Sequence, residues 1–107
     1  MGASKTYQYE TKTKNIAKIA SALGHPARVL IVEKLRSRNF IRNVDLMDVL
    51  LLSRSSIHNH VQKLLDADLI QVDFHPNEYH LCLKTENLVY LSYFLDHGYT
   101  QEIRSGR

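Results

Sequence analysis

Several residue types are scarce in this 107-residue chain, and each scarcity narrows the classes of protein that it can represent. Its single cysteine, Cys82, excludes a disulfide within one molecule and argues against a secreted scaffold. Only two prolines and four glycines interrupt the chain, so mostly regular secondary structure is expected. No run approaches the roughly 20 apolar residues that cross a bilayer, and residues 1–14 lack the apolar core of a signal peptide. We therefore expect a cytoplasmic protein that has no membrane partner.

The sequence also lacks the usual marks of an enzyme. It has no glycine-rich phosphate loop, and its histidines have no obvious carboxylate and nucleophile partners along the chain. We expect neither catalytic activity nor a cofactor. The histidines in question are His25, His58, His60, His75, His80 and His97.

Charge is distributed unevenly along the chain, although the formal net charge is only +3. Residues 1–18 carry four lysines against one glutamate, and residues 28–42 carry five cationic side chains against one glutamate. Residues 66–107 carry seven carboxylates against three cationic side chains. Such polarity would let a basic region meet phosphate while the acidic end points elsewhere, although solvated surface alone also explains it.

The spacing of apolar residues predicts four helices, then a hairpin, then a last helix. The helical segments are residues 14–24, 26–37, 44–51, 54–67 and 85–97, each with an apolar stripe of helical period. Pro26 suits the first turn of the second helix, and Ser53 or Ser55 suits the N-cap of the fourth. Residues 36–43 read as an irregular basic connector.

Strict alternation then predicts two strands within residues 70–83, joined by a tight turn at Pro76 and Asn77. The order α-α-α-α-β-β-α is that of a mainly helical winged helix-turn-helix domain, in which the hairpin is the wing. We assign this domain to residues 14–99, with a flexible arm at 1–13 and a flexible tail at 100–107.

Two stretches resemble motifs of the ArsR/SmtB family. Residues 22–31, Ala-Leu-Gly-His-Pro-Ala-Arg-Val-Leu-Ile, are similar to that family's opening Ala-Leu-Ala-Asp-Pro-Thr-Arg and its aliphatic run. Residues 52–64, Leu-Ser-Arg-Ser-Ser-Ile-His-Asn-His-Val-Gln-Lys-Leu, resemble its recognition segment Leu-Ser-Gln-Ser-Thr-Val-Ser-Arg-His-Leu-Lys-x-Leu. Ala67-Asp68-Leu69-Ile70 lies where the family has Ala-Gly-Leu-Val, and the likeness covers roughly residues 15–95.

The resemblance implies a homodimeric repressor that binds an inverted repeat in double-stranded DNA until an effector releases it. It implies pairing of the first and last helices, and both carry apolar stripes that one small core need not bury. The interface residues expected are Ile16, Ile19, Leu23, Leu88, Leu91, Phe94 and Leu95.

The recognition helix, at about residues 54–67, is expected to read base edges with side chains of its first turns. Arg54 could pair with guanine and Asn59 with adenine, whereas His60 could bond a phosphate. A solvated helix face remains the simpler alternative for the segment taken alone. The DNA-binding residues expected are Ser53, Arg54, Ser55, Ser56, His58, Asn59, His60 and Lys63.

The chain departs from the family at two places. Asp68 replaces the usual glycine, which aspartate can tolerate because it enters the left-handed conformation more readily than most residues. The wing segment Asp73 to Glu78 has no lysine or arginine, unlike the arginine-rich wings common in the family. This leaves an alternative, a winged-helix protein-interaction module that does not bind DNA.

Metal binding at the family's known sites is not expected. The thiolate motif Cys-Val-Cys-Asp-Leu corresponds here to Arg42-Asn43-Val44-Asp45-Leu46, which has neither cysteine. Residues 86–88 and 96–98 lack the spacing of the last-helix site. A non-standard site with His75, His80 and Cys82 is a further alternative, although strand alternation is expected to place only some of them on one face.

Overall fold

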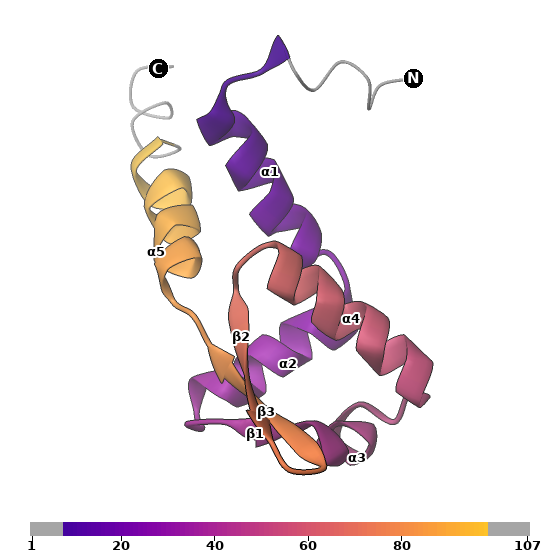
Figure 1. Ribbon diagram of the computed structural model, residues 1–107. Coiled ribbons are helices and arrows are strands. Elements are labelled where there is room, and N and C mark those ends of the chain that lie inside the picture. The colour runs from indigo at the N-terminus through magenta and orange to yellow at the C-terminus, as the bar shows by residue number, and fades with distance from the viewer. Residues whose placement is uncertain (1–7, 99–107) are drawn as a thin grey trace.

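The computed structural model describes residues 8–98, so the predicted flexible tail and residues 1–7 of the predicted arm lie outside the described residues. Figure 1 shows a helical body with a hairpin at one end and a terminal helix at the other. The elements are α1 (Thr11–Ala22), α2 (Pro26–Arg36), β1 (Ile41–Arg42), the 3₁₀ turn η2 (Asn43–Asp45), α3 (Leu46–Leu50), α4 (Arg54–Asp66), β2 (Ile70–His75), β3 (Glu78–Leu83), α5 (Glu86–Tyr93) and the π-helical turn η3 (Phe94–Gly98).

The predicted order of helices and hairpin is confirmed, with corrections at three places. The first helix begins at Thr11 rather than at residue 14. The third helix is only Leu46–Leu50, preceded by the 3₁₀ turn. The segment predicted as an irregular connector ends in a strand, β1, which is only two residues long and therefore too short to show an alternating pattern.

Helix α2 lies at the centre of the helical body. Its N-cap is His25, whose Nδ1 accepts a hydrogen bond from the amide of Ala27 at 3.0 Å, and Pro26 occupies the first helical position as predicted. Ile31 and Leu35 of this helix are buried in the core. Within the apolar run of this helix, Ile31 and Val32 are buried, whereas Val29 is exposed.

The sheet has three antiparallel strands in the order β1-β3-β2. The register pairs Leu81 with Ile41 on one side and with Val72 on the other, so this row of apolar side chains faces the helices. The hairpin turns through two residues, and Asn77 has φ 65°, a conformation that asparagine tolerates. Asp68, where the resembled family has glycine, is also left-handed at φ 58°, as expected.

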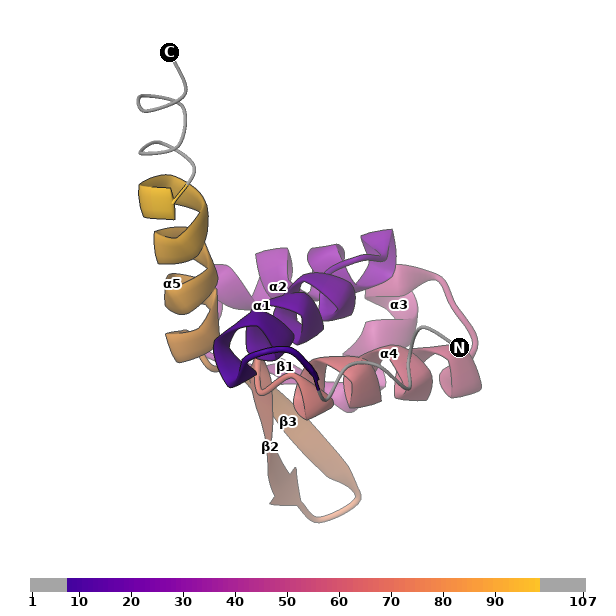
Figure 2. The same cartoon turned by 90° about the horizontal axis from the view of Figure 1, so that it is seen from above.

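The core joins all the helices of the body to the inner face of the sheet. Its completely buried members include Ile31, Leu46, Leu64, Leu69 and Leu81. Helix α5 contributes no buried residue and projects from the body on the side opposite to the hairpin in Figure 2. Within residues 8–98, no helix has the length and apolar character needed to cross a membrane.

Candidate nucleic-acid interface

Helix α4 starts with a side-chain cap made by Ser53. The backbone of Ser53 is extended, and its Oγ accepts a hydrogen bond from the Ser56 amide at 3.3 Å and donates one to Ser56 Oγ at 3.2 Å. Of the two caps expected, Ser53 is therefore the one used. No acidic side chain lies in the first turn, so the positive end of the helix dipole faces solvent without a local counter-charge.

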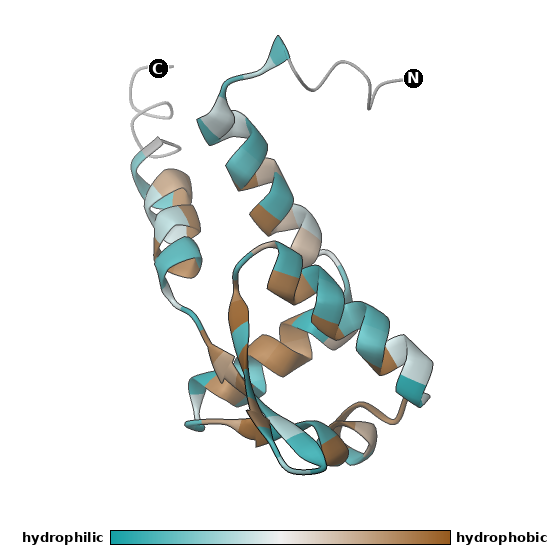
Figure 3. Cartoon of the chain, viewed as in Figure 1, coloured by the Kyte–Doolittle hydropathy of each residue, from teal (hydrophilic) through white to brown (hydrophobic). Residues whose placement is uncertain are grey.

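The two sides of α4 differ in polarity, as Figure 3 shows. Ile57, Val61 and Leu64 are buried against the body. On the outer side, five of the expected DNA-binding residues are exposed, and Ser53 is exposed immediately before the helix. The five exposed helical residues are Arg54, Ser55, His58, Asn59 and Lys63.

Gln62 belongs to the same outer side, although the sequence argument did not select it. It is exposed, and its Nε2 donates to Asp66 Oδ1 at 2.9 Å. Gln62 follows Ser55 by seven residues and Asn59 by three, and residues at these spacings lie on the same side of a helix. This spacing could have placed Gln62 on the outer side of α4.

Of the expected contact residues, Ser56 and His60 are half-buried rather than exposed, and His60 is bound to another helix. It is half-buried, and its Nδ1 accepts a hydrogen bond from Arg28 Nη1 at 3.1 Å. Its ring lies 4.3 Å from the ring of His25, and Arg28 is held in turn by its Nε bond to the Ala22 carbonyl at 2.6 Å. Burial lowers the pKa of His60 below its usual value, and the charges of His25 and Arg28 lower it further. His60 thus joins α4 to the start of α2.

A groove of about 420 Å³ runs between the start of α4, the region of α3 and the tip of the hairpin. Arg54 and His58 line one side of it, and Asn77 at the hairpin tip lines another. The exposed apolar side chains of Val44 and Met47 also line it. The fold therefore brings the exposed side of α4 and the wing tip to one continuous surface.

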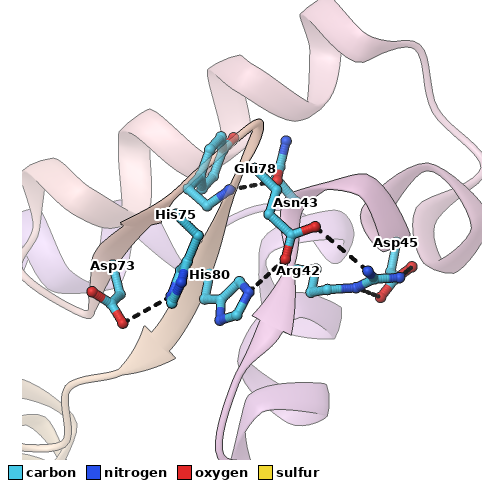
Figure 4. Close-up of polar contacts among 8 residues, drawn as sticks. Arg42, Asn43, Asp45, Asp73, His75, Glu78 and His80 are labelled. Atoms are coloured by element: carbon cyan, nitrogen blue, oxygen red, sulfur yellow. Dashed lines mark hydrogen bonds and ion pairs between the residues drawn. The ribbon is translucent and has the colours of Figure 1, made fainter.

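The wing, defined here as residues 70–83, carries two histidine–carboxylate pairs, drawn in Figure 4. His75 Nε2 donates to Asp73 Oδ2 at 3.1 Å, and His80 Nε2 donates to Glu78 Oε2 at 2.7 Å. The wing has no lysine or arginine, as its sequence required.

Arg42 of β1 is the cation beside these pairs, and it was missed because its strand was not expected. It lies 3.2 Å from Asp45 and 3.5 Å from Glu78. The hydrogen bond and charge of Asp45, followed by the charge of Glu78, raise the pKa of Arg42 above its usual value. The neighbouring Asn43 Oδ1 accepts from the Tyr79 amide at 2.8 Å and so fixes β3 to the 3₁₀ turn.

The residues expected at a dimer interface fall into two groups. Ile19 is only 2% exposed and packs in the core of its own protomer, so it is not available to a partner. Leu23, Leu88 and Leu91 are half-buried against that core, and Ile16 is half-buried on α1.

One group of exposed apolar side chains lies on the C-terminal helical segment, α5 and η3. Phe94 and Leu95 are exposed, at 42% and 55%, together with Val89 and Tyr93, which were not selected from the sequence. Helices α1 and α5 also contact each other within the protomer, although α1 is mostly exposed and α5 has no fully buried residue.

His75, His80 and Cys82 share one face of the sheet, contrary to the expectation that strand alternation would place only some of them together. The register places Asp73 opposite His80 and Gln71 opposite Cys82, so His75, His80 and Cys82 all lie on the outward face of the sheet. Even so, no three histidine, cysteine or carboxylate side chains within residues 8–98 are arranged to hold a metal ion.

Comparison with known proteins gives matches in structure alone. No family model matches the sequence, and no curated protein matches it. A crystal structure of an ArsR family transcriptional regulator superposes with a TM-score of 0.76 and 20% identity, covering 89% of this chain and 95% of that one. An ArsR-like transcriptional regulator from Rhodococcus sp. RHA1 gives 0.76 and 19%, covering 87% of each chain.

A third similar structure is NolR from Sinorhizobium fredii, with a TM-score of 0.66 and 21% identity, covering 81% of this chain and 86% of that one. Each of these superpositions covers at least 81% of this chain. The chain therefore has the ArsR/SmtB-like winged helix fold of the ArsR family transcriptional regulators.

Proposed function

We propose that this chain is a DNA-binding transcriptional regulator that inserts α4 into the major groove. The observation that carries the proposal is the two-sided character of α4, which is buried along one side and presents Arg54, His58 and Asn59 on the other. Arginine and asparagine are the side chains whose paired donors and acceptors match the edges of guanine and adenine. The fold shared with ArsR family regulators supports the same role.

The proposed regulator is a homodimer that represses transcription from an inverted repeat. Two recognition helices related by a two-fold axis would read half-sites about 34 Å apart, one turn of DNA. The exposed apolar end of α5 and η3 supplies the surface for pairing, and burying it removes the cost of its contact with water. An effector other than a metal at the family's known sites would relieve repression. The same proposal implies a non-enzymatic protein that acts in the cytoplasm.

Selection of bound duplexes from a random pool, followed by titration of the selected site, tests the proposal. The logarithm of the affinity should fall with the logarithm of salt concentration, with a slope near −0.9 for each phosphate contacted. Arg54→Ala should weaken binding to the selected site by about 1–3 kcal/mol and relax its sequence preference. Arg36→Ala, which removes an equally charged exposed side chain from the end of α2, is the matched control and should retain binding.

One observation favours a second candidate, a protein-interaction module without DNA binding. The wing carries two carboxylates and no lysine or arginine, and the nearby guanidinium of Arg42 is already paired with Asp45 and Glu78. If the pool yields no bound duplex at low salt, this second function replaces the first. A selected site that Arg54→Ala and Arg36→Ala bind equally well would contradict the assignment of α4 as the recognition helix.

A further inference from the structure

The side-chain amide of Gln62 is held in one orientation by a neighbour on the same helix. Its Nε2 donates a hydrogen bond to Asp66 Oδ1 at 2.9 Å, and both side chains are exposed. An ionised carboxylate can only accept, so the amide cannot turn over without setting its own oxygen against that of Asp66. The bond therefore fixes which end of the amide presents the hydrogens.

Gln62 lies on the side of α4 that faces away from the body of the protein. Ile57, Val61 and Leu64 mark the buried side, and Gln62 shares the outer side with Asn59, three residues before it. The positions of Asn59 and Gln62 are about 4.5 Å apart along the helix axis, close to the spacing of about 3.4 Å between stacked base pairs. If α4 sets Asn59 against a base edge in the major groove, Gln62 reaches the edge of a neighbouring base.

The bond to Asp66 limits what the amide of Gln62 can offer to a base. A free glutamine amide has two N–H donors and one acceptor oxygen, and Asp66 occupies one of the donors. One donor and one acceptor remain, and this pair matches the N7 acceptor and the N6 donor of adenine. Guanine presents two acceptors at the same edge, N7 and O6, and pairing with both requires both N–H groups.

Helix stability alone gives little reason for an acid at the position of Asp66. It is the last residue of α4, where the unpaired carbonyl groups carry negative partial charge, and a carboxylate at such an end is unfavourable. A glutamine–aspartate pair four residues apart stabilises a helix only weakly. The acid is therefore better explained by what it does to the amide of Gln62.

We propose that Gln62 is a specificity-determining residue that reads adenine in the major groove, and that Asp66 is a positioning residue that makes Gln62 reject guanine. Asp66 acts through Gln62, because it takes one amide hydrogen and keeps the amide from turning over. The inference rests on the proposed DNA-binding function, and it assigns a base preference to one position of the bound sequence.

Selection of duplexes from a random pool by wild-type protein and by Gln62→Ala identifies the base pair that Gln62 contacts. The variant should lose the preference for adenine at one position of each half-site and keep the other preferences. Replacing this adenine by 7-deazaadenine, which lacks the N7 acceptor, should weaken wild-type binding by about five-fold and have no effect on Gln62→Ala. Gln71→Ala removes an exposed glutamine from β2, so it is the matched control and should select the wild-type sequence.

Two replacements of Asp66 separate its positioning role from its charge. In Asp66→Ala both N–H groups of Gln62 are free, so the preference for adenine over guanine should fall from about ten-fold in the wild type to near equality. Asp66→Asn removes the same negative charge but keeps an acceptor oxygen, so it should retain most of the preference. Circular dichroism and urea midpoints verify that both variants fold, as expected for replacements of an exposed side chain.

The outcomes distinguish this inference from the proposed function. If Gln62→Ala changes no adenine preference in the selected sequence, Gln62 does not read a base. If folded Asp66→Ala keeps the wild-type ratio of adenine to guanine, and only its stability differs, the pair is purely structural. Both results leave DNA binding by α4 intact, whereas a pool that yields no bound duplex removes the proposed function and this inference together.

Discussion

His60 shows how a single side chain can link the recognition helix to the body of the protein. Arg28 can only donate, so His60 Nδ1 must accept, and the imidazole in this contact is neutral. Protonation would remove the acceptor and place two cations side by side. The polar contact between α2 and α4 is therefore sensitive to acid in a way that the apolar contacts around it are not.

The lowered pKa of His60 predicts a loss of stability in acid. The unfolded chain binds a proton near pH 6.5, its ordinary value, whereas the folded protein resists protonation until a lower pH. Stability should be complete above about pH 6.5 and fall as the pH drops toward the pKa of the folded state. The measurement is the urea midpoint between pH 5 and 8. His60→Asn keeps an acceptor that does not titrate, so its midpoint should fall less; an identical decline in both proteins would disprove this origin.

For single residues, the sequence predicted correctly those interactions whose partners lie close together along the chain. The Ser53 cap depends on a bond to Ser56, three residues away, and the serine cluster indicated it directly. The contact of His60 with Arg28 joins residues 32 positions apart. The sequence suggested only that His60 could bond a phosphate, because no local pattern reveals a partner on another helix. Ile19 was expected at a dimer interface, and the structure buries it in the core of its own protomer; a helical stripe alone does not say which of these partners it meets.

At the scale of elements, the turn between α3 and α4 has an unusual residue. Leu51 ends α3 in the left-handed conformation, at φ 57°, and its side chain is 85% exposed. A left-handed conformation costs an ordinary residue about 1–2 kcal/mol, and this exposed leucine buries little surface in return. No glycine or asparagine marks the turn, which explains why the sequence predicted helix through residue 51.

Replacement of Leu51 should therefore stabilise the protein. Leu51→Asn places a residue that tolerates this backbone and should raise the free energy of unfolding by about 0.5–1 kcal/mol. Leu51→Ala removes the same exposed apolar group but retains the backbone cost, so it should give no comparable gain. Chemical denaturation of the three proteins measures the difference. Equal stability of the asparagine and alanine variants would show that the backbone at this turn is not strained.

β1 illustrates what element prediction misses in a small mixed fold. Ile41 is buried and Arg42 exposed, which is a single step of alternation and cannot be distinguished from a loop. Its pairing with β3 nevertheless brings Arg42 to Glu78 and creates the charge network beside the wing. The hairpin was predictable because two longer alternating runs flank a turn with the right residues.

At the scale of the whole molecule, the exposed side of α4 and the exposed apolar side chains of the C-terminal helical segment lie on different elements. Five of the expected DNA-binding residues are exposed on α4, whereas exposed apolar side chains gather on α5 and η3, which project from the body in Figure 2. A helix that buries no residue in its own protomer gains stability when a second copy covers it. This division of surfaces is what a dimer requires if both recognition helices are to reach one duplex.

Leu95→Glu tests this division, because the charge would be placed on a side chain that is 55% exposed in the protomer and expected to be buried in the dimer. Burial of an unpaired carboxylate is strongly unfavourable, so the variant should be a folded monomer with greatly weakened binding to an inverted repeat. Phe74→Glu is the matched control for association, because Phe74 is 80% exposed on the wing and should leave the dimer intact. Sedimentation equilibrium distinguishes the two states. A dimeric Leu95→Glu protein would mean that the copies pair through another surface, and that the spacing of the recognition helices must be derived from it.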